Sequence, residues 1–274
     1  MEIHVLVENS SANEKIEGRH GLSLLIKTDN KSILYDFGPK NSLLKNADNL
    51  SVSLEDIDFA VLSHNHIDHG GDINNFCKLN NKATIHVNTN LSDRLYTKLF
   101  SFIKFPIGIK LNQEYRNRII EHNKSDEISE NIYLLRLSDY ISKSTLNRDL
   151  FIKKNNGYEN DTFQHESALV IKDNNELVIF CACSHHGVSN IIDDAEKQFP
   201  NHRIKAFVGG FHMCNPVSKK NESEIYIRNE IEKLKEKNIV YYTGHCTGDY
   251  AFSLFKSELK DKINKISTGM IINI

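Results

Sequence analysis

The sequence predicts an α/β fold: a two-sheet sandwich with helices on the outside. Two observations lead to this prediction. Short β-branched and aromatic runs occur in two sets, one in the first third of the chain and one in the second half, and segments with helical spacing follow each set. Histidines also follow four of the predicted strands. Two sets of strands with accompanying helices are typical of a layered α/β domain.

The first third of the chain is rich in predicted strands. Runs 3–9, 22–28 and 32–38 are β-branched or aromatic, and the polar turn TDNKS between the last two predicts a hairpin. The elements expected next are a short helix at 42–48, a buried strand at 57–63, a helix at 71–79 and a strand at 83–88.

The second half alternates strands with helices. The run 167–184 predicts a hairpin around a DNN turn. Helices are expected at 188–199, 222–237 and 249–259, and strands at 204–210, at 239–245 and in the closing segment KISTGMIINI.

Residues 90–165 are less regular, although 92–105 has helical spacing and apolar residues recur through the segment. We therefore treat 1–274 as a single domain in which 90–165 is an insertion that caps the site and selects the substrate. The stretch SFIKFPIGIK offers an apolar and aromatic surface on which a flat ring could stack. A simple packed insertion is the alternative interpretation.

Composition narrows the class of protein. The 274 residues are 39% hydrophobic and 26% charged, with a net charge of −2 and a pI near 6.7. These values are typical of an ordinary soluble globular protein, and no nucleic-acid partner is expected because they do not indicate a basic stripe, although local basic patches stay open. No apolar run approaches membrane length, and the N-terminus has no signal-peptide pattern. The five cysteines form no CxxC pair, which favours reduced thiols in a cytoplasmic protein. The oligomeric state is left open.

The stretch LSHNHIDHGG at 62–71 places three histidines and an aspartate, all common metal ligands, at the end of a predicted strand. Alternation places His64 and His66 on the same side of an extended segment, where both could bind one metal ion. A turn at the following glycines would let Asp68 and His69 reach a second ion. Nitrogen and oxygen ligands suit Zn²⁺, with Fe or Mn as alternatives. A surface histidine loop is the alternative, and the buried character of the preceding strand argues against it.

Three other predicted strands also end in histidines. CACSHHG contains His185 and His186, VGGFHM contains His212, and YTGHCTG contains His245. Each one alone is ordinarily a hydrogen-bonded histidine near a strand end. Together with the first cluster they favour one shared metal site.

These motifs resemble those of the metallo-β-lactamase superfamily, whose signature HxHxDH matches HNHIDH. ILYDFG with Asp36, CSHHG and GHCTG resemble further motifs of that superfamily. The chain is most similar to the branch that contains dihydropterin ribofuranosyl-aminobenzene phosphate synthase, which shares HGLS (20–23), CSH.G..NI (183–191), GGFH (209–212) and HCTG (245–248). The resemblance implies a four-layer αββα sandwich with two divalent metal ions, Zn²⁺ before Fe or Mn, at one edge.

The resemblance also implies roles for individual residues. His64, His66 and His185 would hold the first metal, and Asp68, His69 and His245 the second, with His186 as a weaker candidate. Asp36 would support the metal loop from behind. The superfamily's hydrolytic members usually have a bridging Asp where this chain has His212, which could bridge the metals, contact substrate or transfer a proton.

With one ligand carboxylate, two divalent ions would leave a net charge of about +3, which favours a phosphorylated substrate. His212 and Asp68 are the expected catalytic residues, and His20 and His212 the expected substrate-binding ones. Of the cysteines near these motifs, Cys183 and Cys246 are expected to be packed, whereas Cys214 is a candidate site thiol. A helix cap or surface role is expected for the acidic residues Asp161 and Glu166.

The leading hypothesis is a hydrolase that uses a metal-activated water on a small anionic substrate. The branch implies a transferase that joins a dihydropterin methyl pyrophosphate to an aminobenzene ribofuranosyl phosphate. A third alternative is a non-catalytic sensor of a small ligand. A nuclease is disfavoured by the missing bridging Asp and basic surface, and His66 argues against a di-iron flavoprotein, which usually has Glu there.

Overall fold

The computed structural model describes residues 1–89, 91, 94–99 and 103–274. The chain divides into two compact units. The first unit comprises residues 1–93, 107–123 and 266–274, and the second comprises 94–106 and 124–265. Within the described residues, no helix has the length and apolar character needed to cross a membrane.

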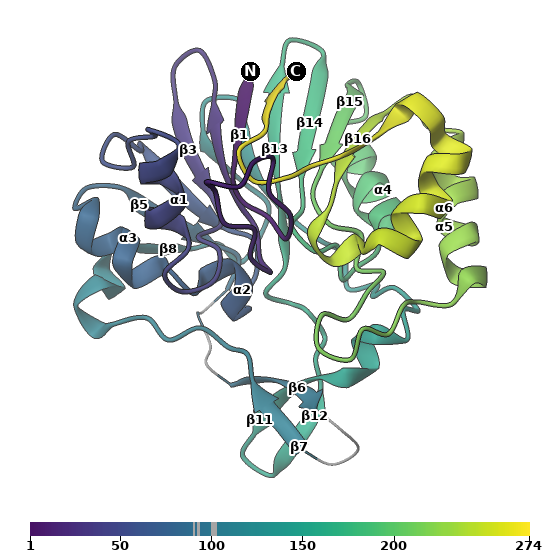
Figure 1. The fold of residues 1–274 in the computed structure, drawn as a ribbon, viewed down its shortest axis with the longest axis horizontal. Helices are drawn as coiled ribbons and strands as arrows, with labels where there is room; N and C mark the ends of the chain where they lie inside the picture. Colours follow the sequence, from purple (N-terminus) through teal and green to yellow (C-terminus); the bar gives the residue numbers. More distant parts are fainter. Residues whose placement is uncertain (90, 92–93, 100–102) are drawn as a thin grey trace. The chain divides into compact units, whose positions relative to one another are not determined.

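The first unit is built on a seven-stranded sheet with strand order β18-β1-β2-β3-β4-β5-β8 (Figure 1). β18, β1, β2 and β3 pair antiparallel, so the predicted hairpin at the TDNKS turn is confirmed, whereas β3, β4, β5 and β8 run parallel. The elements are β1 (Glu2–Val7), β2 (Ser23–Lys27), β3 (Ser32–Tyr35), α1 (Leu43–Asn49), β4 (Phe59–Leu62), α2 (Ile67–Gly70), α3 (Ile73–Leu79), β5 (Thr84–Val87), η1 (Gln113–Arg118), β8 (Ile119–Glu121) and β18 (Ile271–Asn273).

Helices α1 and α3 cover one face of this sheet. Leu43 of α1 and Phe76 of α3 belong to the same buried cluster as Leu34 of β3 and Leu62 of β4. All four residues of β4 are buried, which is typical of a parallel strand covered on both faces. The burial of this continuous FAVL run fixes the point where the chain emerges into the histidine motif.

The second unit contains a seven-stranded sheet with order β17-β16-β15-β14-β13-β10-β9 and three longer helices. Its elements are β9 (Asp126–Ser129), β10 (Ile132–Arg136), η2 (Leu146–Asp149), β13 (Ser167–Asp173), β14 (Glu176–Phe180), α4 (Val188–Gln198), β15 (Arg203–Val208), α5 (Glu224–Lys235), β16 (Val240–Thr243), η3 (His245–Thr247), α6 (Asp249–Leu259), η4 (Lys260–Lys262) and β17 (Ile263–Lys265). The predicted hairpin is β13–β14, and every helix predicted in this half is present.

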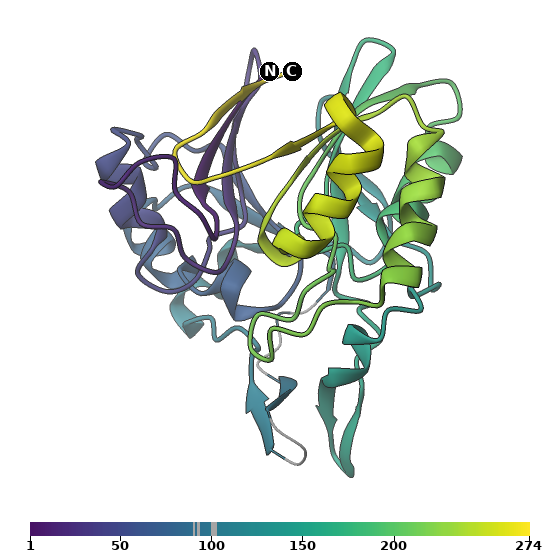
Figure 2. The ribbon, with the colours of Figure 1, turned by 45° about the vertical axis from the view of Figure 1, so that its right-hand side comes forward.

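Apolar stripes attach the helices to this sheet. Ile191 of α4, Ile231 of α5 and Phe255 of α6 share one buried cluster with Ile179 of β14 and Tyr241 of β16. Figure 2 shows α5 and α6 running alongside each other. β14, β15, β16 and β17 are parallel, so their carboxyl ends meet at one edge of the sheet. In open parallel sheets that edge is where ligands bind.

A separate four-stranded sheet also belongs to the second unit, with order β12-β11-β6-β7 (Figure 1). Its strands are β6 (Leu95–Leu99), β7 (Ile103–Pro106), β11 (Leu150–Lys154) and β12 (Gly157–Asn160). The helix expected over 92–105 is therefore wrong where the chain is described; residues 92–93 and 100–102 lie outside the described part. Burial in β6 alternates with a period of two, and pairing with β11 satisfies its backbone. The capping role of 90–165 stays a prediction.

Candidate metal centre

The histidine motif of the first unit brings three buried imidazoles together. His64, His66 and His69 are at most 5% exposed. The ring centroid of His64 lies 4.6 Å from that of His66 and 4.3 Å from that of His69. His64 follows β4 directly, and His66 precedes the short helix α2, so the turn expected at this point places all three rings on one side of the loop.

Asp36 fixes this loop through hydrogen bonds to Ser63 and His69. It is fully buried after β3 in a left-handed conformation with φ of 60°. One carboxylate oxygen accepts the backbone N–H of Ser63 at 2.7 Å. The other lies 2.7 Å from both the Ser63 hydroxyl and Nδ1 of His69. These contacts are compatible with the supporting role that the family resemblance implies, which stays a prediction.

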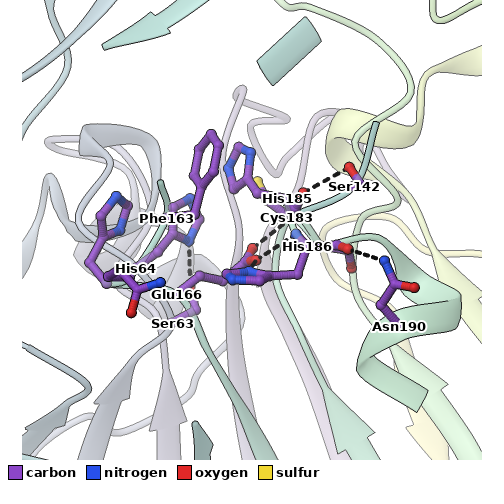
Figure 3. Close-up of polar contacts among 12 residues, drawn as sticks. Ser63, His64, Ser142, Phe163, Glu166, Cys183, His185, His186 and Asn190 are labelled. Atoms are coloured by element: carbon purple, nitrogen blue, oxygen red, sulfur yellow. Dashed lines mark hydrogen bonds and ion pairs between the residues drawn. The ribbon is translucent and has the colours of Figure 1, made fainter. Parts of the chain in front are cut away.

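These contacts determine which nitrogens carry protons. The ionised carboxylate of Asp36 can only accept, so Nδ1 of His69 and the Ser63 hydroxyl must donate to it. The Ser63 oxygen then accepts from Nδ1 of His64 at 2.8 Å (Figure 3). Both rings are therefore protonated on Nδ1 and carry their lone pair on Nε2, the form in which histidine binds a metal. These side chains fit the ion that the sequence implied.

The HGLS segment packs onto the same loop. Nε2 of His20 lies 3.2 Å from a carboxylate oxygen of Asp68, which places this half-exposed pair at the rim of the cluster. Gly21 has φ of 149°, and a Cβ there would stand 2.3 Å from the backbone oxygen of Asp68. Glycine is required at this position for both reasons. His20 thus lies beside a predicted ligand, as its proposed role near substrate needs.

In the second unit, His185, His212 and His245 follow β14, β15 and β16 and are all buried. The ring centroids of His185 and His212 are 4.1 Å apart. Phe163 stacks on His185 at 4.4 Å with the planes within 8° of parallel, and both residues are labelled in Figure 3.

Polar side chains fix His185 further. Ser142 and Asn147 each donate to its backbone oxygen at 2.9 Å, and the Ser142 bond is drawn in Figure 3. The side-chain oxygen of Asn147 lies 3.3 Å from Nδ1 of His185. That oxygen only accepts, so Nδ1 carries the proton and Nε2 the lone pair. His185 is therefore in the same metal-binding form as His64 and His69.

Glu166 is a supporting residue whose role the sequence analysis missed. A surface or cap role was expected, but Glu166 is 1% exposed, and its two oxygens accept the backbone N–H groups of His185 and His186 at 2.9 and 3.0 Å. It also binds Nδ1 of His186 at 2.6 Å (Figure 3). Burial raises the pKa of Glu166, but these donors outweigh it and the net pKa is lowered. The one sequence feature that could have indicated this role is the position of Glu166 directly before the buried strand β13.

His186 and Asp161 also acquire definite partners. Glu166 holds Nδ1 of His186 in the way that Asp36 holds Nδ1 of His69, so the preference for His185 over His186 as a ligand stays a prediction. Asp161 was expected at the surface or in a cap, yet it is buried, accepts the backbone N–H of Phe163 at 2.8 Å and lies 3.0 Å from Nε2 of His165. It therefore supports the residue that stacks on His185.

His212 differs from the other histidines of this unit. It has φ of 53°, and its backbone N–H donates to the sulfur of Cys246 at 3.3 Å. Within the described part of the chain, neither of its buried ring nitrogens has a hydrogen-bond partner. An imidazole buried in this way is costly unless a ligand completes its bonding. His212 is thus available to contact metal or substrate.

The cysteines of the second unit are arranged around the backbone. The thiol of Cys246 lies 3.6 Å from the backbone oxygen of Cys183, and a Cβ at Gly210 would come within 2.5 Å of the Cys246 sulfur. Cys183 and Cys246 are buried, as expected. Burial raises the pKa of Cys214, which keeps it a thiol at neutral pH and weakens its case as a metal ligand.

The structure thus brings together two sets of predicted site residues, one inside each unit. Asp36, His20 and the four ligands of the HxHxDH motif are adjacent in the first unit. His185 and His212 are adjacent in the second, and His245 follows the neighbouring strand β16. A single centre built from both sets stays a prediction.

Comparison with known proteins places these motifs in context. Residues 16–135 match the family described as "Metallo-beta-lactamase superfamily". A 7,8-dihydropterin-6-methyl-4-(β-D-ribofuranosyl)-aminobenzene-5′-phosphate synthase of Methanocaldococcus jannaschii is 26% identical, covering 99% of this chain and 96% of that protein.

Two solved structures extend the comparison. The crystal structure of Tm1679, described as a metal-dependent hydrolase of the β-lactamase superfamily, has a TM-score of 0.82 and 28% identity, with 100% of this chain and 99% of that one covered. Zn²⁺-bound PqqB from Methylobacterium extorquens shares the fold alone, with a TM-score of 0.60 and 9% identity over the whole of both chains. The predicted α/β fold class is therefore confirmed.

Proposed function

We propose that the chain is a metal-dependent hydrolase of the metallo-β-lactamase superfamily that acts on a small anionic, phosphorylated substrate. The observation that carries the proposal is the orientation of its histidines. His64, His69 and His185 each donate the Nδ1 proton to a defined acceptor, which leaves Nε2 as the ligand atom. Such support is typical of metal ligands.

We propose that the chain binds two divalent ions. Zn²⁺ is the expected ion, with Fe or Mn as alternatives. His64, His66 and His185 would hold one ion, and Asp68, His69 and His245 the other. When bound, the ions would supply a Lewis acid that lowers the pKa of water and neutralises charge on a phosphate.

The chain's own residues would orient these ligands and move a proton. Asp36 and Ser63 keep His64 and His69 in one tautomer. His212 would transfer a proton to or from substrate, because its buried ring nitrogens have no partner among the described residues. His20 would contact the substrate beside Asp68. This arrangement makes His212 the candidate acid or base and Asp68 the one ligand carboxylate.

An anionic substrate is supported by the charges that would surround it. Neutral imidazoles leave most of the charge of two divalent ions uncompensated. Helix α4 begins just after His186, spans 11 residues and has no acidic residue in its first turn. Its N-terminal N–H groups therefore present positive potential next to the metal-binding segment. A phosphate is the small group that best matches both features.

A second candidate function is the transferase reaction, in which a dihydropterin methyl pyrophosphate is joined to an aminobenzene ribofuranosyl phosphate with release of pyrophosphate. The synthase from M. jannaschii supports it, because its similarity extends over nearly the full length of both proteins. Both reactions break a bond to a phosphorylated group, so the same ligands would serve either. A cytoplasmic location, expected from the cysteine pattern of the sequence, is part of the same proposal.

The deciding experiment is product analysis of metal-loaded protein by liquid chromatography and mass spectrometry. One reaction series contains phosphomonoesters, phosphodiesters and pyrophosphate compounds, each alone, and a second contains both transferase substrates together. Water-derived products from single substrates support the hydrolase, whereas a condensed product and pyrophosphate support the transferase. Binding without any product would reject both and leave the ligand sensor.

The matched control uses two histidine variants. His66→Ala should lose bound metal and turnover together, because His66 is a proposed ligand in the buried cluster. His4→Ala should keep both, since His4 pairs with Glu2 on the first strand and lies outside the histidine motifs. Full metal content in His66→Ala would contradict the proposed ligand set. Metal content is measured by inductively coupled plasma mass spectrometry.

A further inference from the structure

The four-stranded sheet of the second unit carries a distinctive set of side chains on one face. Residues that are directly paired across adjacent strands point to the same face of a sheet. Phe151 is paired with Tyr96, Lys153 with Tyr158, and Lys98 with Lys104. With the alternation along each strand, these pairs place six side chains together. We define the aromatic–basic face as Tyr96, Lys98, Lys104, Phe151, Lys153 and Tyr158.

This face is open, whereas the opposite face is partly covered. None of the six residues is buried, and Tyr158 is 42% exposed. On the other face, Leu95, Thr97 and Leu150 are all buried. The aromatic rings are therefore not explained by packing against the core of the unit. Aromatic side chains kept at an open surface are a common feature of binding sites.

The rings and ammonium groups are organised with respect to one another. Tyr96 and Tyr158 meet edge to face with centroids 5.0 Å apart. The ammonium of Lys104 lies 4.6 Å from the ring centroid of Phe151 and 4.8 Å from that of Tyr158. These cation–π contacts hold a positive charge at the centre of the ring cluster.

The charge of this face is of one sign. Its other described members, Pro106 and Asn160, are uncharged, and the nearby Glu159 is paired with Ile152 on the opposite face. Among the described residues of this face, three lysines and no carboxylate give a local excess of positive charge in a chain whose net charge is −2. A ligand complementary to this face is an anion that also offers flat rings.

We propose that the aromatic–basic face binds single-stranded nucleic acid, with bases stacked on the exposed rings and phosphates held by the lysines. Sequence-tolerant single-strand binding uses this combination of stacking and positive charge. Four strands span roughly 14 Å, which exceeds the footprint of one nucleotide and suits two or three in succession. This inference is independent of the proposed hydrolase site. It revises the expectation of no nucleic-acid partner, which rested on the net charge of the whole chain.

The same features argue against a lipid surface as the occupant. Membrane-binding surfaces insert large apolar side chains among their basic residues. The exposed apolar side chains of this sheet, Ile103 and Phe105, lie on the opposite face from the three lysines. The side that carries the positive charge therefore presents rings in place of an aliphatic anchor.

Fluorescence anisotropy of the full-length, metal-loaded protein with a labelled 12-nucleotide oligothymidine tests the proposal. Tyr158→Ala should weaken binding about tenfold, the range found when one stacking ring is removed. Raising the salt from about 50 to about 200 mM should weaken wild-type binding roughly 20-fold if three phosphates are neutralised. Tyr158→Phe keeps the ring and should restore binding to within about twofold.

Two neighbouring lysines supply a matched control. Lys153→Glu reverses a charge on the aromatic–basic face, whereas Lys154→Glu makes the same change on the opposite face of the same strand. The first should weaken binding about tenfold and the second by less than about twofold. Circular dichroism spectra that match wild type establish that the variants are folded.

Several outcomes would overturn the inference. These are absence of binding at low salt, equal effects of the two lysine variants, and unchanged affinity in Tyr158→Ala. Competition by thymidine monophosphate as strong as that by the oligomer would point to a single-nucleotide site. Tighter binding to vesicles of phosphatidylserine and phosphatidylcholine than to the oligomer would identify a lipid surface.

Discussion

The histidines of the two units are assembled in different ways. In the first unit, the predicted ligands come from one six-residue motif, HNHIDH, whose loop is held by Asp36 and Ser63. In the second unit, the histidines come from the ends of three different strands, β14, β15 and β16, and Glu166 supports only those that follow β14. Histidines that are contiguous in sequence can be oriented by the same supporting side chains. Histidines on different strands need a separate supporting side chain at each strand end. Substitutions should therefore act collectively in the first unit and individually in the second.

Asp36→Asn should have the broadest effect, because it changes the shared support and so alters both folding and metal binding. The amide nitrogen would face the Ser63 hydroxyl or Nδ1 of His69, both of which donate. Loss of these buried charge-assisted bonds should cost about 2–4 kcal/mol of folding free energy. Metal affinity should fall about 10- to 100-fold. Urea unfolding of the apoprotein and metal titration measure the two effects.

The control is Asp58→Asn, which also alters a carboxylate that accepts a backbone N–H, here that of Ser32, at an exposed position. It should change neither stability nor metal binding by a measurable amount. Equal effects of the two substitutions would show that Asp36 is an ordinary structural carboxylate.

His212→Ala should have a narrower effect that is confined to turnover. Removing a proton-transfer group lowers kcat by about 10²- to 10⁴-fold while the metal content remains. Steady-state kinetics and metal analysis on the same sample test both statements. Loss of about one equivalent of metal would instead assign His212 to the place of the superfamily's bridging aspartate. In that case a single histidine of the second unit would support a metal ion as Asp36 supports the motif of the first unit, and the contrast between the units would weaken.

Much of the first unit's motif could be predicted from sequence because its residues are contiguous. The spacing of His64, His66, Asp68 and His69 was sufficient to predict their grouping. Asp36 entered only through a family resemblance, since the bond from its carboxylate to His69 spans 33 residues. Glu166 lies 19 and 20 residues before the two N–H groups that it binds, and no local pattern records such a contact.

The segment expected to be helical at 92–105 was also mispredicted because a contact with a distant part of the chain decides its structure. Its apolar spacing was compatible with a helix, but β6 is paired with β11, more than 50 positions later in the sequence. Pairing with a distant strand decides between helix and strand when a short apolar run is ambiguous. The aromatic–basic face could not be predicted for this reason, because it exists only in the register of β6, β7, β11 and β12.

Glu166→Gln should weaken metal retention about tenfold, because it loosens only the segment that carries His185 and His186. The lowered pKa of Glu166 also gives a pH signature. Its ionised form contributes stability above the unfolded pKa of about 4.5, and this contribution is lost as the pH falls through the lower folded value. The difference in unfolding free energy between wild type and Glu166→Gln should shrink below about pH 4.5. A constant difference across that range would contradict the role of its charge.

Phe163→Leu should have the smallest effect, and it is the most direct test of whether histidines in the second unit are supported individually. The leucine keeps the site apolar but removes the ring that stacks on His185, an interaction worth about 1 kcal/mol. His185 should become more mobile, while His64 and His69 are unaffected. The ion held by His185 should therefore dissociate about fivefold faster than the ion held by His69. Phe199→Leu is the control, since Phe199 packs edge-on against Tyr133. Competition with a chromogenic chelator resolves the two rates. Equal acceleration of both ions would mean that support is shared across the whole centre, and the contrast between collective and individual support would fail.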